Sequence, residues 1–191
     1  PLKPIIKELA AQFGRWELSA LYIQEPGARI MPCNWKIAQD AFCEAYHVSR
    51  THPQVIRSLG DVNSQVHTWD NCERVITPGG TPSPLLDYEL SDEDMLRAMM
   101  DIPLEAEAPT IPEGMSARAF LAAMSREGLR ADAGDKVDVY CDAEIVDSID
   151  YTQFPNFHPW GAFNKIVYRF RPNGNDHRTS IMECYQLMPF Q

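Results

Sequence analysis

Asn34-Trp-Lys-Ile-Ala-Gln-Asp-Ala-Phe-Cys-Glu-Ala-Tyr-His-Val-Ser-Arg-Thr-His52 is the stretch of this 191-residue chain on which the prediction of fold and function depends. Asn34 is a residue type that caps helix N-termini, and apolar residues recur after it at helical spacing. The pattern predicts a helix over residues 35–46, with His47 at its C-terminal end. His52 lies just beyond, where Pro53 disfavours helix for the residue before it.

The two histidines of this stretch form a candidate metal site, because imidazole nitrogens bind iron, zinc and copper. A regular helix brings residues three or four apart onto one face, so a spacing of five requires the chain to bend. The spacing alone is weak evidence for a metal. The remaining histidines, His67, His158 and His177, lack ligand spacing, and we expect them to be structural or surface groups.

Working outward from this stretch, strands are predicted on both sides of a helical segment. An amphipathic helix is expected first, then a strand hairpin that turns at residues 25–27, and a Pro- and Gly-rich loop begins after residue 77. We interpret residues 78–135 as a helical insertion in a single domain of residues 1–191. The predicted helices are 4–13, 35–46, 92–100 and 117–127, and Ser91 and Ser116 are expected to cap the last two. The predicted strands are 16–23, 28–33, 65–70, 73–77, 165–171 and 180–188. A turn at 172–175 is expected to join the last two strands. This order indicates an α+β fold with an antiparallel sheet.

Composition excludes several classes of function. The formal net charge of −10 opposes binding to nucleic acid or to anionic membranes. No apolar run approaches the roughly 20 residues of a membrane span, and no secretory signal is recognisable, so we expect a cytoplasmic protein. The five cysteines are widely spaced without a Cys-x-x-Cys pair, which favours buried reduced thiols over disulfides or a zinc ribbon.

The stretch from Asn34 to His52 resembles the mononuclear-iron motif of Rieske non-haem iron oxygenases, the aromatic-ring-hydroxylating family. The shared features are Asn34-Trp35-Lys36, an acidic residue three positions before the first histidine (Glu44), Tyr46-His47, and His52-Pro53. Two later blocks, Phe154-Pro-Asn156 and Arg171-Pro-Asn-Gly174, resemble downstream patterns of the same family and occur in the same order.

The resemblance implies a role for each matching residue. His47 and His52 would be two ligands of a mononuclear Fe(II), which leaves open positions for dioxygen and substrate. Glu44 would occupy the position of the carboxylate that links this iron to the Rieske cluster of a neighbouring subunit, and it would orient a ligand imidazole. The Tyr46 hydroxyl would either stabilise the site or only pack.

Two parts of the family's machinery are expected outside these 191 residues. The Rieske 2Fe–2S cluster needs Cys-x-His and Cys-x-x-His pairs, which this sequence lacks, so we expect that domain before Pro1. The third iron ligand, a carboxylate, is expected beyond Gln191. Asp176 and Glu183 are the late acidic residues, and neither matches its position. The 191 residues alone are therefore expected to be inactive.

The resemblance also implies a fold and partners. The fold would be a helix-grip (START-like) domain, a curved antiparallel sheet around a long helix. The protein would hydroxylate a small apolar, aromatic substrate with dioxygen, as the terminal oxygenase component of a mono- or dioxygenase. Electrons from NAD(P)H would arrive through a reductase, with or without a ferredoxin, and the full-length protein would be a homotrimer or an α3β3 assembly. Aromatic residues between 154 and 163 are expected in the core, some of them lining an apolar pocket beside the iron.

Two other functions remain open on the residues alone. The same histidine pair could hold zinc in a hydrolase, which would need a general base and no Rieske partner. The chain could also be a helix-grip module that binds a ligand without catalysis.

Overall fold

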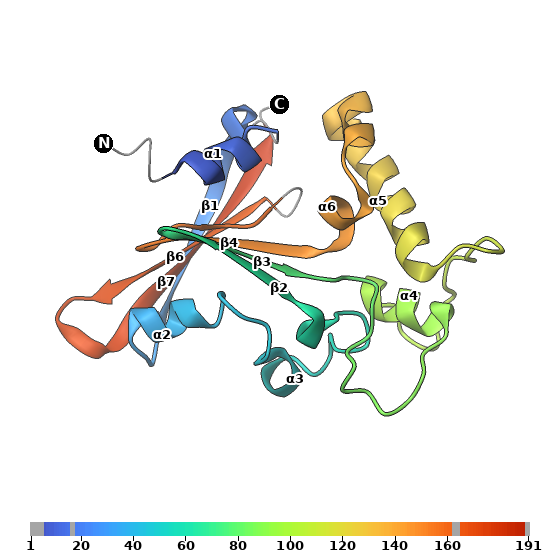
Figure 1. The fold of residues 1–191 in the computed structure, drawn as a ribbon, viewed down its shortest axis with the longest axis horizontal. Helices are drawn as coiled ribbons and strands as arrows, with labels where there is room; N and C mark the ends of the chain where they lie inside the picture. Colours follow the sequence, from blue (N-terminus) through green and yellow to red (C-terminus); the bar gives the residue numbers. More distant parts are fainter. Residues whose placement is uncertain (1–5, 16–17, 162–164, 190–191) are drawn as a thin grey trace. The chain divides into compact units, whose positions relative to one another are not determined.

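The computed structural model of the chain describes residues 6–15, 18–161 and 165–189 (Figure 1). Contacts divide the chain into two compact units, which we describe separately. The first unit comprises residues 1–44, 66–75 and 149–191, and the second comprises residues 45–65 and 76–148. The helical insertion predicted at 78–135 lies within the second unit, and the single-domain organisation stays a prediction.

Antiparallel strands form most of the first unit. One sheet has the order β1-β7-β6-β5, and its strands β1, β7 and β6 are labelled in Figure 1. A second sheet has the order β2-β3-β4. The elements that belong wholly or mainly to this unit are α1 (Lys7–Phe13), the 3₁₀ turn η1 (Leu18–Ala20), β1 (Leu21–Met31), α2 (Trp35–Asp40), β2 (Gln65–Trp69), β3 (Cys72–Thr77), β4 (Ser148–Gln153), β5 (His158–Pro159), β6 (Ile166–Asn173) and β7 (Asp176–Pro189).

Two tight turns set the strand pairing that the sequence predicts. Asp70 adopts φ 46° between β2 and β3, and Gly174 adopts φ 59° between β6 and β7. Positive φ angles match the right-handed twist of a two-residue hairpin, and glycine and aspartate tolerate them. The expected strands at 65–70, 73–77, 165–171 and 180–188 are therefore confirmed.

The hairpin predicted for residues 16–33 is wrong. Residues 21–31 form one continuous strand, β1, which pairs with β7 and shows a register irregularity between Ile23 and Pro26. Pro26 and Gly27 therefore mark a bulge. An edge strand accommodates proline because its missing N–H costs no ladder hydrogen bond, and β1 is an edge of its sheet. Trp16 and Glu17 lie outside the described residues.

The helix predicted over residues 35–46 ends early. Asn34 caps α2 as expected, its side chain accepting a hydrogen bond from the Lys36 N–H, but α2 ends at Asp40. The Phe42 ring then packs 5.0 Å from Tyr168 and 5.1 Å from Phe170 of β6. This contact with the sheet requires a tighter path than a regular helix, so tertiary packing overrides the local helical pattern.

Helices dominate the second unit. Its elements are α3 (Val48–Thr51), η2 (Asp61–Asn63), α4 (Asp92–Met100), α5 (Ala117–Ala133), η3 (Gly134–Val139) and α6 (Asp142–Val146). Ser91 and Ser116 cap α4 and α5 as predicted, accepting from the N–H groups of Asp94 and Ala119. The prediction ended α5 at residue 127, too early, because the helix continues to Ala133. Gly134 terminates it with φ 58°.

The fold is mixed α+β with antiparallel sheets, as predicted, but the expected long central helix is not seen. Within the described ranges the longest helix is α5, with 17 residues, and it belongs to the second unit. The helix that packs on the β6–β7 face of the first unit is α2, which has six residues. No helix in the described part of the chain has the length and hydropathy required to cross a membrane.

Candidate functional site

The histidines of the motif lie at the two ends of a single helical turn. His47 is the residue before α3 and His52 is the residue after it. The His47 carbonyl accepts hydrogen bonds from the N–H groups of Arg50 and Thr51 and from the Thr51 hydroxyl, at 2.9 to 3.0 Å. His52 then leaves helical geometry at φ −129°, ψ 51°. The bend that a spacing of five requires is therefore present.

This turn brings the two imidazoles together. Their ring centres are 5.4 Å apart and their planes make an angle of 75°. Two imidazoles bound to adjacent positions of one metal ion, with metal–nitrogen distances of about 2.1 Å, have ring centres about 5 Å apart. His47 is half-buried and His52 is exposed, so the pair lies at the surface of the second unit. The donor set and its spacing fit a mononuclear metal ion.

The other two motif residues have different environments. Glu44 is half-buried in the first unit, in the irregular segment that follows α2. Tyr46 belongs to the second unit, and its side chain is 71% exposed. The role of Glu44 as a bridge and the role of the Tyr46 hydroxyl stay predictions.

The described residues do not complete a three-ligand site. Across the described ranges, no three histidine, cysteine or acidic side chains lie close enough together to hold a metal ion. Glu183 pairs with Arg169 and Arg171 on β6, at 2.5 and 3.1 Å, and these bonds hold its carboxyl pKa at about 2. Asp176 pairs with Arg178. Both late carboxylates form ion pairs with arginines of the β6–β7 hairpin. The identity of the third ligand stays a prediction.

A chain of polar side chains, which the sequence did not indicate, connects the motif to the two sheets of the first unit. Cys43 is half-buried, and Thr152 and His158 are buried. The Cys43 thiol lies 3.4 Å from the Thr152 hydroxyl, which lies 3.0 Å from Nδ1 of His158. His158 is 1% exposed, and its Nε2 has no hydrogen-bond partner. It was expected to be a structural or surface group, and the structure shows the buried, structural alternative.

Burial keeps this chain neutral. It lowers the pKa of His158 to about 4 and raises the pKa of Cys43 to about 11. Burial also raises the pKa of the Glu73 carboxyl, an effect partly offset by a hydrogen bond with Cys43. A protonated His158 would place a charge and an unpaired donor in the interior, which is costly. The only sequence signal for this arrangement is the Phe154-Pro-Asn156 block, which lies between Thr152 and His158.

The cysteines and the two other histidines have simpler roles. All five thiols are free, as predicted, but the expectation that they are buried holds only for Cys72. Cys33, Cys43 and Cys184 are half-buried, and Cys141 is exposed. His67 stacks on Trp69 with ring centres 6.0 Å apart, and His177 is exposed on β7.

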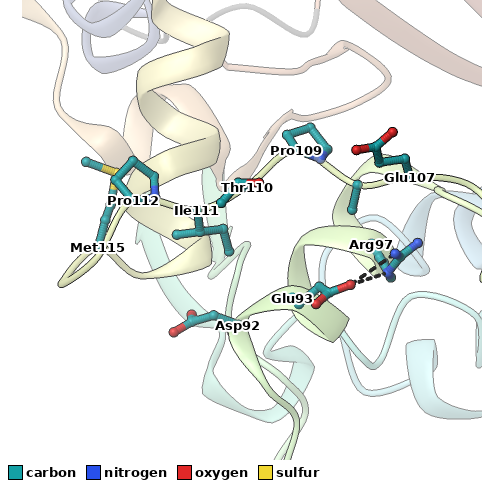
Figure 2. Close-up of a pocket in the computed structure, with 10 residues that line it drawn as sticks. Asp92, Glu93, Arg97, Glu107, Pro109, Thr110, Ile111, Pro112 and Met115 are labelled. Atoms are coloured by element: carbon teal, nitrogen blue, oxygen red, sulfur yellow. Dashed lines mark hydrogen bonds and ion pairs between the residues drawn. The ribbon is translucent and has the colours of Figure 1, made fainter.

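A cavity of about 490 Å³ beside α4 in the second unit is a weaker candidate site (Figure 2). Two of its polar side chains, Arg97 and Asp92, form hydrogen bonds that connect neighbouring segments of the second unit. Arg97 donates to Glu93 and to the carbonyls of Pro103 and Ala106, which ties the Pro-rich segment to α4. Asp92 accepts a hydrogen bond from the first N–H of α5 at 2.7 Å. We assign these groups a structural role.

Comparison with known proteins identifies the family. The model of the ring-hydroxylating alpha subunit catalytic domain matches residues 8–188. The chain therefore belongs to the family of ring-hydroxylating oxygenase alpha-subunit catalytic domains, as the motif indicated. No curated protein matches the chain.

Solved structures show the same fold at low identity. A variant of naphthalene 1,2-dioxygenase bound to phenanthrene is 21% identical, with a TM-score of 0.53, over 99% of this chain and 40% of that one. A quaternary ammonium Rieske monooxygenase in complex with an inhibitor is 12% identical, with a TM-score of 0.53. The match covers 98% of this chain and 36% of that one. The chain thus spans about two fifths of the length of these relatives.

Replacing His158 with Gln is expected to reduce the dependence of stability on pH. The folded protein keeps His158 neutral down to about pH 4, whereas an unfolded histidine binds a proton near pH 6.5. The imidazole therefore stabilises the fold fully above about pH 6.5, and this contribution is lost as the pH falls toward 4. Urea unfolding at pH 7 and at pH 4 should show that the native protein loses up to about 3 kcal/mol more than His158→Gln does.

The exposed His177 is the matched control. His177→Gln should show the same pH dependence as the native protein. Equal losses of unfolding free energy in the native protein and in His158→Gln would contradict the neutral, buried state of His158.

Proposed function

We propose that the chain is the catalytic part of the terminal oxygenase component of a cytoplasmic Rieske-type ring-hydroxylating oxygenase, with His47 and His52 as ligands of a mononuclear Fe(II). The observation that supports this proposal is the pair of imidazoles held 5.4 Å apart by the one-turn helix α3. Membership of the ring-hydroxylating family supports iron over zinc. When bound, the iron supplies dioxygen activation, which the protein side chains cannot provide.

The residues of this chain would hold and orient the metal and the substrate. His47 and His52 present their imidazoles from one turn, and the third ligand would be a carboxylate beyond Gln191. Glu44 would orient an imidazole and link the iron to the cluster of a neighbouring subunit, with Tyr46 beside the pair. The substrate would be a small apolar, aromatic molecule that receives one or both oxygen atoms.

The whole protein would supply what these 191 residues lack. A 2Fe–2S Rieske cluster would receive electrons from NAD(P)H through a partner reductase, with or without a ferredoxin. A homotrimer or an α3β3 assembly would bring the cluster of one subunit to the iron of the next. The similar solved chains are about two and a half times longer than this one, which supports the proposal that the whole protein has further parts.

Replacing both His47 and His52 with alanine in the intact protein should remove only the mononuclear iron. The native protein should contain about three irons per chain, two in the cluster and one mononuclear, and the double variant about two. Metal analysis together with the visible spectrum of the cluster measures both. A variant with His67→Ala and His177→Ala carries the same number of changes and should keep all three.

Zinc in place of iron in the native protein would contradict the proposal and favour a hydrolase. Full retention of iron by the His47→Ala, His52→Ala variant would show that the metal lies elsewhere.

Replacing Glu44 with Gln should slow turnover without removing the iron. The amide keeps the size of the side chain but loses the charge that orients an imidazole and connects it to the cluster. Loss of such an outer carboxylate typically costs about 10- to 100-fold in activity. The rate at which the reduced cluster is reoxidised in the presence of substrate measures the effect, with iron content measured on the same sample.

Glu89→Gln is the matched control, because Glu89 is an exposed glutamate of the second unit. Its reoxidation rate should equal that of the native protein. An unchanged rate in Glu44→Gln would exclude the bridging role.

A further inference from the structure

Gly79, in the loop that follows β3, is held by an ion pair between the start of α5 and the end of α6. The Arg118 side chain, in the first turn of α5, donates to both the Gly79 carbonyl and the Asp147 carboxylate. The same carboxylate oxygen, Oδ1, accepts a hydrogen bond from the Gly79 N–H at 2.9 Å. Asp147 is the residue that ends α6. We call the group formed by Gly79, Arg118 and Asp147 the Gly79 clamp.

The Gly79 clamp is tightly packed. Gly79 is buried, and the Asp147 side chain is 6% exposed against 27% for Arg118. A Cβ atom on Gly79 would clash with the Val146 carbonyl oxygen, so only glycine allows this approach of the two backbones. A buried carboxylate that loses its partner is costly. The loop at Gly79 therefore cannot move away from α6 without a loss of stability.

The loop that contains Gly79 is bonded to the segment that follows His52. Leu59 forms an antiparallel bridge with Gly79 itself. Three backbone hydrogen bonds of 2.8 to 2.9 Å join residues 56–60 to residues 78–83, between Ile56 and Ser83, Ser58 and Gly80, and Gly60 and Pro78. The position of residues 56–60 is therefore determined by the loop that the Gly79 clamp holds.

The segment at 56–60 is in turn bonded to His52. The Ser58 N–H donates to the Val55 carbonyl at 3.0 Å, and the Val55 N–H donates to the His52 carbonyl at 3.0 Å. All of these residues, together with His47, belong to the second unit. A continuous path of backbone hydrogen bonds thus leads from the Gly79 clamp to the residue that carries the second imidazole.

We propose that Arg118 and Asp147 are positioning residues for His52, which keep its imidazole beside that of His47 by fixing the loop at Gly79. Hydrogen-bond networks of this kind carry energetic coupling between groups that do not touch. The consequence for metal binding rests on the proposed function, whereas the backbone path exists without a metal.

Hydrogen–deuterium exchange of the intact protein tests the backbone path, once a chelator has emptied the mononuclear site. Arg118→Met combined with Asp147→Asn removes the ion pair and leaves no unpaired charge. Amides of residues 52–60 should then exchange at least about tenfold faster than in the native protein, because local opening becomes easier. Mass spectrometry of the peptides measures this rate, and the amides of α4 show whether the unit stays folded.

Arg126→Met combined with Asp142→Asn is the matched control. Arg126 also projects from α5 and donates both to a carboxylate, that of Asp142, and to a backbone carbonyl, that of Tyr140. The control should leave the exchange of residues 52–60 unchanged. Unchanged exchange in the clamp variant, or equal acceleration in the control, would overturn the proposal.

Arg118→Lys is the milder variant, and it decides the question if the double variant does not fold. It keeps a positive charge beside Asp147 but replaces the planar guanidinium that bonds both acceptors. The same residues, 52–60, should exchange faster by a smaller factor, with Arg126→Lys as the control. Native exchange in Arg118→Lys would then overturn the proposal.

The dissociation constant of Fe(II) at the mononuclear site, measured by chelator competition, extends the test to the imidazole pair. The clamp variant should bind Fe(II) about tenfold more weakly, with the iron of the cluster unchanged, as for other groups that orient a ligand. Faster exchange with unchanged affinity would overturn the positioning role. A native protein without mononuclear iron would contradict the proposed function, while faster exchange in the variant would still support the positioning of His52.

Discussion

The chain between His47 and His52 forms one short turn of helix, α3, which brings the two imidazoles together. The turn is held by hydrogen bonds to the His47 carbonyl and by the bond from the His52 N–H to the Val48 carbonyl, at 2.8 Å. A longer helix would rotate the second imidazole away from the first, and an extended segment would separate them. The pairing of the imidazoles therefore depends on this turn.

The first unit supports the start of the motif by packing. α2 lies on the β6–β7 face, and Phe42 enters the aromatic cluster with Tyr168 and Phe170. Immediately after Phe42, the half-buried Cys43 begins the polar chain that runs through Thr152 to the buried His158. Because burial keeps His158 and Cys43 neutral, this connection adds hydrogen bonds without burying a charge.

Local signals predicted those elements whose boundaries depend on local chemistry. Ser91 and Ser116 marked the starts of α4 and α5, and the Asn-Gly pair at 173–174 marked the β6–β7 turn. Predictions were wrong where contacts with residues distant in the sequence determine the end of an element. Pro26 appeared to end a strand, but pairing with β7 keeps β1 continuous through a bulge. The helix after Asn34 appeared to reach Tyr46, but contacts of Phe42 with β6 end it at Asp40.

The candidate site shows the same division. The two histidines were found from the sequence because the motif is contiguous, so short-range spacing contains the information. The Cys43–Thr152–His158 chain was not found, because it joins segments more than a hundred residues apart. Strand pairing, which a single sequence does not specify, brings those segments together.

Anomalous diffraction at the iron absorption edge, from crystals of the intact protein, tests the central claim most directly. The account predicts a mononuclear iron peak within bonding distance of imidazole nitrogens of both His47 and His52, separate from the peaks of any cluster. A mononuclear iron bound by other side chains, or no iron peak beside this pair in the fully loaded protein, would contradict it.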